Sequence, residues 1–171
     1  MKRKFLKTSS YIVLASMLGL TAAYALRSER AVAQGDSPGG KLEGTWRADV
    51  TVRNCQTGNV IRTFQSLITY TPPATPDVRG GSVLEQSNST FFRSGGQGIW
   101  RHEGGPNFST NFRFFLFNSS GVLTGTSDVT KIIVLGPGDN EYTATTASEI
   151  RDLNGNLLQA GCATDIARRV E

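Results

Sequence analysis

The chain has 171 residues, and its 18 Lys and Arg residues exceed its 14 Asp and Glu residues to give a formal net charge of +4. Six of the basic residues and only one acid, Glu29, lie in the first 34 residues, so residues 35–171 carry 12 basic and 13 acidic side chains and a net charge of −1. This balance argues against nucleic acid or another polyanion as the partner of that part of the chain. A stretch of 137 residues is also the size of one ordinary domain, which argues against a multidomain protein.

The N-terminus has the three regions of an export signal. Residues 1–10 are basic and polar, residues 11–26 are nearly all apolar or small, and Ala31-Val32-Ala33 has the small-x-small pattern of a signal-peptidase site. We therefore predict a cleavable export signal at residues 1–33 and an exported, periplasmic or extracellular protein of a bacterium. The apolar run is shorter than the ~20 residues of a spanning helix and no second run follows, so no stable membrane span is expected after processing.

Two features of this signal leave alternatives open. Residues 2–7, Lys-Arg-Lys-Phe-Leu-Lys, resemble a twin-arginine signal in which Lys replaces the first Arg, and they equally suit an ordinary Sec signal. An uncleaved N-terminal anchor is the alternative to cleavage after Ala33.

Two cysteines, Cys55 and Cys162, lie in the remaining chain, and His102 is its one histidine. In an oxidising compartment an even pair of cysteines predicts a disulfide, and a catalytic Cys–His pair is the alternative. No metal site is expected, because a single histidine and no Cys-x-x-Cys offer too few ligands. We predict no cofactor.

The processed chain has the pattern of an all-β protein. Residues 34–43, rich in Gly and Ser, are predicted to be flexible. Beyond Gly44, alternating apolar and polar residues and β-branched or aromatic runs are separated by Gly, Pro and Asn-Gly turns. The predicted strands are 44–53, 60–71, 82–87, 97–103, 108–117, 122–135, 141–151 and 156–169. Short turns between eight strands favour one domain, residues 44–171, that forms an eight-stranded antiparallel up-and-down β-barrel; a β-sandwich is the alternative.

A closed barrel would pair the first strand with the last. If the two cysteines lie opposite each other, Asp49 faces Arg168, which is a favourable pair of opposite charges. The same register places Arg169 diagonal to Trp46 with both side chains directed inward, while Asp49 and Arg168 point outward. These agreements favour closure over the sandwich.

Gly44-Thr45-Trp46, at the start of the first strand, resembles the Gly-x-Trp motif of the lipocalins and the wider calycin superfamily. In that family an Arg near the end of the last strand packs across the Trp and closes the barrel, and Arg169, or Arg168 before it, matches that position. The resemblance implies a lipocalin-like barrel that carries a small hydrophobic ligand. Asp139-Asn140-Glu141-Tyr142 departs from the family's Thr-Asp-x-Tyr motif, and no long helix precedes the final strands.

The inward face of the predicted strands is rich in aromatic residues, which would line a cavity for a small apolar molecule. We predict as cavity-lining residues Phe64, Tyr70, Trp100, His102, Phe112, Phe114 and Tyr142. Phe108 shares this face. Phe115 and Phe117 fall on the opposite face, which indicates either a bulge or an exposed apolar patch.

No catalytic residue is assigned, because the sequence has no Gly-x-Ser-x-Gly elbow and no recognisable triad. Asp165 faces inward by its parity. Three other acids have ambiguous or outward parity: Glu85, Asp128 and Glu149. Two functions remain beside the carrier: a barrel enzyme of the cyclase or isomerase type, with His102, Asp165 or Tyr142 as its polar group, and an interaction module with a filled barrel.

Overall fold

A computed structural model of the chain describes residues 40–75, 79–89 and 92–170. The predicted export signal at residues 1–33 lies outside the described residues, as do residues 34–39 of the segment predicted to be flexible. No helix in the described part of the chain is long and apolar enough to cross a membrane.

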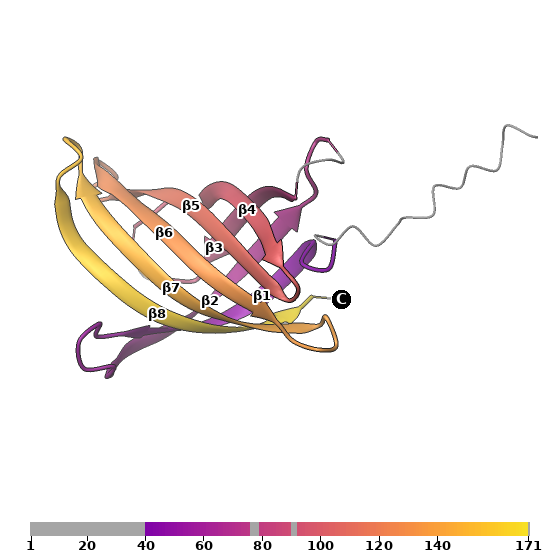
Figure 1. Cartoon of the computed structure of the whole chain (residues 1–171). Helices are drawn as coiled ribbons and strands as arrows, with labels where there is room; N and C mark the ends of the chain where they lie inside the picture. The colour runs from indigo at the N-terminus through magenta and orange to yellow at the C-terminus, as the bar shows by residue number, and fades with distance from the viewer. Residues whose placement is uncertain (1–39, 76–78, 90–91, 171) are drawn as a thin grey trace, which may run out of the picture. The chain divides into compact units, whose positions relative to one another are not determined.

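The described residues form eight antiparallel strands in one closed barrel, in which each strand pairs with the next and the last pairs with the first (Figure 1). The strands are β1 (Gly44–Arg53), β2 (Val60–Thr71), β3 (Gly80–Ser87), β4 (Gly96–Gly104), β5 (Asn107–Phe117), β6 (Leu123–Leu135), β7 (Glu141–Asp152) and β8 (Leu157–Arg169). Each begins and ends within two residues of a predicted strand. The predicted all-β barrel is confirmed, and the sandwich is excluded.

The connections gather at two ends of the barrel, because successive strands run in opposite directions. The β1–β2, β3–β4, β5–β6 and β7–β8 turns lie at one end, on the left in Figure 1. The β2–β3, β4–β5 and β6–β7 connections lie at the other end, together with the end of β8. We call the first the open end and the second the closed end, since buried aromatic side chains fill only the second.

Burial alternates along the strands as their sequence pattern predicts. On β1, Trp46, Ala48 and Val50 are buried, whereas Arg47 and Asp49 are exposed. The same alternation in the other strands directs one set of side chains into the barrel, where they form a single apolar cluster. The barrel wall is therefore one sheet with an interior and a solvent face.

The register between β1 and β8 differs from the prediction. Cys162 lies opposite Arg53, the last residue of β1, because the first cysteine lies in the turn beyond that strand. Every pair along this ladder is displaced by two residues, so Asp49 faces Ile166 and the predicted pair of Asp49 with Arg168 is wrong. Since side chains alternate with a period of two, this displacement leaves each side chain on its predicted face.

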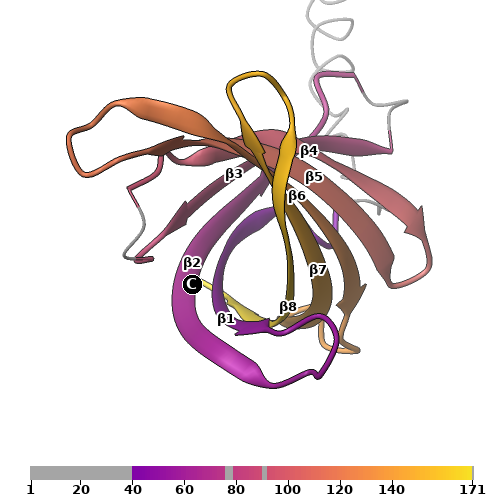
Figure 2. The ribbon, with the colours of Figure 1, turned by 90° about the vertical axis from the view of Figure 1, so that its left-hand side faces the viewer.

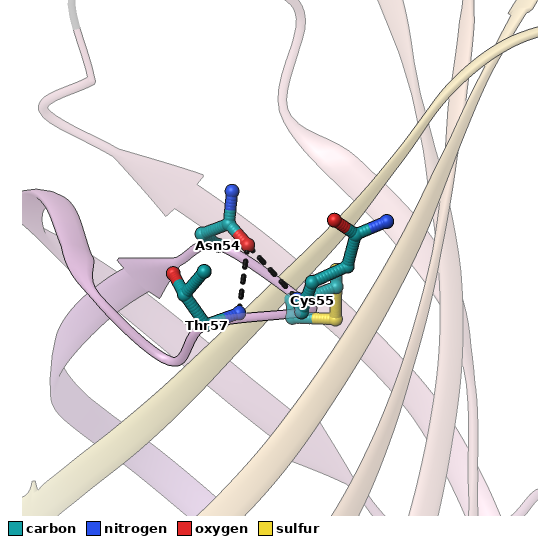
Figure 3. Close-up of a disulfide and its surroundings, with 5 residues drawn as sticks. Asn54, Cys55 and Thr57 are labelled. Atoms are coloured by element: carbon teal, nitrogen blue, oxygen red, sulfur yellow. Dashed lines mark hydrogen bonds between the residues drawn. A yellow bond between two sulfur atoms is a disulfide. The ribbon is translucent and has the colours of Figure 1, made fainter.

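Cys55 and Cys162 form the predicted disulfide, which ties the β1–β2 turn to β8 at the open end (Figure 3). The turn is ordered by Asn54, whose side-chain oxygen accepts hydrogen bonds from the backbone N–H groups of Gln56 and Thr57, each at 2.9 Å. The bond joins residues 107 apart in sequence, so it restricts the unfolded chain strongly.

Candidate ligand-binding site

The interior of the barrel is hollow toward the open end, into which Figure 2 looks. The cavity there has a volume of about 510 Å³. Small-molecule sites commonly have volumes of ~300–1,000 Å³. Its wall is mainly apolar, with side chains from six strands: Val50, Val52, Phe64, Phe112, Phe114, Val129, Ile150 and Ala163. An apolar molecule of moderate size would fit these dimensions and this lining.

The closed end is filled by packed aromatic rings. Tyr142 lies against Trp46 with ring centroids 4.9 Å apart. The ring of Tyr70 packs edge-on against those of Tyr142 and Trp100, with centroid distances of 6.4 Å in each pair. The hydroxyl groups of Tyr70 and Tyr142 are 3.4 Å apart. Burial raises the pKa of both tyrosines above the ordinary value, and the negative charges of nearby carboxylates act in the same direction. Both phenols therefore stay neutral, and this aromatic layer separates the cavity from solvent at the closed end.

Arg169 lies across the outside of this layer. Its guanidinium is centred 4.3 Å from the ring of Trp46 and donates hydrogen bonds to the backbone carbonyls of Lys41, Glu43 and Asp139. Gly44 permits this approach, because a Cβ there would lie 2.8 Å from the Arg169 Nη1 atom and the backbone has a φ of +114°. The Gly-x-Trp motif at the start of β1 and Arg169 at the end of β8 thus contact each other and join the first and last strands of the barrel.

Two buried ion pairs form the floor of the cavity, between the aromatic layer and the apolar wall. The first joins Lys131 on β6 to Asp165 on β8, with the two side chains 4% and 0% exposed. Thr146 on the intervening strand β7 donates a hydrogen bond to the same carboxylate oxygen at 3.4 Å. The second oxygen, Asp165 Oδ1, is buried without a hydrogen-bond partner. Lys131 reaches the cavity, and its Nζ lies 5.9 Å from the ring centroid of Phe112.

The second pair joins Glu85 on β3 to Arg93, which precedes β4. Arg93 Nη2 donates hydrogen bonds to both carboxylate oxygens and to Ser87 Oγ, and the Ser66 hydroxyl donates to Glu85 Oε1 at 2.6 Å. The guanidinium also stacks over Phe114 at 4.1 Å from the ring centroid. Both oxygens of the Glu85 carboxylate and the Nη2 atom of Arg93 therefore form hydrogen bonds within the protein.

Arg62 adds a further cation to the cavity wall. Its guanidinium lies 5.3 Å from the ring centroid of Phe64. Burial lowers its pKa, and the positive charge of Arg93 lowers it further, although an arginine remains charged under either influence. Its Nη1 atom donates a hydrogen bond to Ser89 Oγ at 3.3 Å.

The predicted cavity residues occupy two different levels of the barrel. Phe64, Phe112 and Phe114 line the cavity. The other aromatic residues of the prediction, Tyr70, Trp100 and Tyr142, are almost fully buried in the layer beneath it. Gly96 on β4 makes room for Phe112, since a Cβ there would lie 2.6 Å from the ring.

His102 lies away from the cavity, near the β4–β5 turn at the closed end. Its Nε2–H donates a hydrogen bond to the carbonyl of Gly105 at 2.8 Å, and its ring packs 4.8 Å from that of Phe108. The structure thus does not bring this imidazole together with the carboxylates of the floor.

Four charged cavity residues were not among the predicted site residues: Arg62, Glu85, Arg93 and Lys131. Glu85 is in phase with the buried Val83, and Lys131 is in phase with the buried Val129 and Ile133, so strict alternation along β3 and β6 was the available signal. Arg93 lies in a connection and carries no such signal.

Phe115 and Phe117, which fall on the outward face by sequence parity, end up in different places. Phe115 is exposed on the outer wall. The pairing of β5 with β6 shifts between Leu116 and Phe117, and this irregularity allows Phe117 to line the cavity near its mouth. The predicted bulge is therefore present, and Phe115 lies on the exposed face that its parity predicts.

Most of the carboxylate and thiol groups around the cavity already have partners within the protein. Among residues 40–75, 79–89 and 92–170, no group of three or more His, Cys, Asp or Glu side chains could hold a metal ion. Both buried carboxylates are already ion-paired, and both cysteines are in the disulfide. The floor can, however, present charge and hydrogen-bonding groups to the inner end of a ligand.

No protein-family model and no curated protein sequence matches the chain. Among solved structures, the S-type phycobiliprotein lyase CPES from Guillardia theta is similar at 10% sequence identity, with a TM-score of 0.43 over 80% of this chain and 92% of that chain. At that identity and score, the activity of that protein does not transfer to this one.

Proposed function

We propose that this protein is an exported, lipocalin-like carrier that holds one small, mostly apolar molecule in the barrel. The observation that carries the proposal is the cavity of about 510 Å³, lined by aromatic and aliphatic side chains and closed at one end by a packed aromatic layer. Transfer of an apolar ligand into such a space is favourable by ~25 cal/mol per Å² of apolar surface removed from water. The export signal predicted at residues 1–33 supports the location.

The floor supports a ligand with one polar end. Burying two ion pairs costs desolvation energy that a hydrophobic floor would avoid, so stability alone does not explain Lys131 with Asp165 or Glu85 with Arg93. A polar group of the ligand would meet these side chains at the inner end of the cavity, while its apolar body would contact Phe64, Phe112 and Phe114 on the walls. The ligand would thereby bind in one orientation.

A matched pair of substitutions tests the cavity. Ala163→Phe places a ring in the cavity from β8, whereas Ala147→Phe places the same ring on the exposed face of the neighbouring strand β7. The probe is N-phenyl-1-naphthylamine, a neutral apolar fluorophore that brightens when it leaves water. We expect Ala163→Phe to weaken probe binding at least roughly tenfold, which equals about 1.4 kcal/mol, and Ala147→Phe to bind as the wild type does. Equal binding by all three proteins would contradict the proposal.

The buried charges support a second candidate, a barrel enzyme of the cyclase or isomerase type. Glu85 and Lys131 both reach the cavity, and either could move a proton on a bound substrate. The two candidates differ in what happens to the natural ligand. Because an enzyme would already have converted a molecule that co-purifies with it, the test adds candidate apolar molecules in excess to fresh protein. A carrier returns them with unchanged chromatographic retention, and an enzyme returns a new species.

A further inference from the structure

We propose that the open end of the barrel docks on the surface of a lipid bilayer, with the mouth of the cavity facing the lipid. This inference goes beyond the proposed ligand, because adsorption to lipid can be measured whether or not the cavity is occupied. It rests on where the exposed apolar side chains lie, on the charge of the turns around them, and on the position of the cavity mouth.

The described residues include eight large apolar side chains, each 39–65% exposed, in or beside the turns of the open end. We call them the rim. It consists of Val60, Ile61, Phe92, Val122, Leu123, Leu153, Leu157 and Leu158. Each of the four connections at this end, which faces the viewer in Figure 2, has at least one rim residue in it or beside it. By contrast, the described connections of the closed end, residues 72–75, 105–106 and 136–140, contribute no large exposed apolar side chain, and among the described residues beside that end only Val134 and Val170 expose such a side chain.

Three of the four connections that carry the rim contain no charged residue, and the fourth, which carries Phe92, contains Arg93, whose guanidinium is ion-paired with Glu85. Residues 54–59, 118–122 and 153–156 contain no Lys, Arg, Asp or Glu. The charged residues beside them are engaged within the protein: Arg53 donates to Gly58 O and Thr164 Oγ1, Arg151 donates to Gly155 O and forms an ion pair with Glu149, and Asp152 accepts from its own turn. Such an end suits the neutral headgroup and upper acyl region of a bilayer, where uncharged polar turns stay hydrated while apolar side chains leave water.

The shape of the rim favours lipid over a protein partner. Its members stand on separate turns around an opening, so a partner must touch several isolated points at once and leave the middle free. A deformable lipid surface meets this requirement without a complementary shape. The rim is also continuous with the cavity, since Ile61 and Phe92 belong to both. An apolar ligand could then pass between bilayer and cavity without crossing water.

The test compares three forms of the chain that begins at Gln34. The described residues in this range form the closed barrel and the disulfide among themselves, so this part of the chain is used for all three forms. The rim variant is Val122→Ser/Leu153→Ser/Leu158→Ser, whose positions lie outside the cavity lining. The wall variant is Leu67→Ser/Leu84→Ser/Phe115→Ser, which changes three similarly exposed side chains along a groove on the outer face. Each form is mixed with vesicles of phosphatidylcholine, with and without phosphatidylglycerol, and sedimented at low and high salt.

We expect the wild type and the wall variant to bind phosphatidylcholine vesicles equally, with little effect of salt or of the anionic lipid. The rim variant should bind at least roughly tenfold more weakly, because each replacement of Leu or Val by Ser removes the favourable free energy of moving an apolar side chain out of water. Three results would overturn the proposal: equal losses in both variants, binding that requires the anionic lipid at low salt, or no vesicle binding together with a dimer that only the rim variant loses. Binding of N-phenyl-1-naphthylamine, measured in the same samples, reports the cavity separately from the rim.

Discussion

Removing the positive charge from the cavity floor should strongly destabilise the barrel. In Lys131→Met, the carboxylate of Asp165 stays fully buried, keeps only the 3.4 Å hydrogen bond from Thr146, and still has no partner for Oδ1. Leaving one partner of a buried ion pair uncompensated typically costs ~3–5 kcal/mol, and we expect a loss of that size in the free energy of unfolding. The measurement is urea-induced unfolding of the oxidised protein, followed by tryptophan fluorescence.

The control is the double variant Lys131→Met/Asp165→Leu, which replaces both charges with apolar groups of similar length. Such replacements are often neutral or stabilising, so the double variant should recover most of the stability that the single variant loses. A loss below ~1 kcal/mol in Lys131→Met, or a double variant as unstable as the single one, would refute the reasoning that the pair is desolvated and mutually compensated.

Three further predictions concern the closed end and the disulfide. Trp46→Ala should cost about 3–5 kcal/mol because it empties the centre of the aromatic layer, and a loss below ~1 kcal/mol in urea unfolding would contradict this role. Replacing both cysteines with Ala should cost about 2–5 kcal/mol, and two free thiols in a thiol titration of the exported protein would contradict the disulfide itself. Tyr70 and Tyr142 are the only tyrosines after residue 33, and their raised pKa values mean that the unfolded chain ionises first as pH rises. The free energy of unfolding should therefore keep its full value below pH ~10 and decrease above it, and phenolate absorbance should appear together with unfolding. Phenolate that forms near pH ~10 while the barrel stays folded would contradict the burial of the two tyrosines.

Period-two alternation predicts most of the fold because it is a local property. The inward positions of Trp46 on β1 and of Phe112 on β5 follow from it, as do the ends of the strands at Gly- and Pro-containing turns. The register of β1 against β8 does not, since it depends on where β1 ends relative to the first cysteine. Arg53 ends the strand, and Cys55 reaches Cys162 from the turn beyond it.

The polar floor is harder to predict, because it combines residues whose usual environment is solvent. Lys131 has inward parity, but lysine is rarely buried unless it is paired, and its partner Asp165 lies two strands away. Arg93 reaches Glu85 because the connection before β4 runs beside the end of β5, where the Ser94 N–H bonds to Phe115 O at 3.0 Å. That path is set by tertiary packing and leaves no periodic trace in the sequence.

The account depends most on the claim that the cavity holds a small apolar molecule. Native mass spectrometry of the protein purified from the compartment to which it is exported tests this claim directly. We expect a bound small molecule on the wild type and on Ala147→Phe, and none on Ala163→Phe. Apo protein in every case, with no mass shift after addition of fatty acids or isoprenoids, would contradict the account.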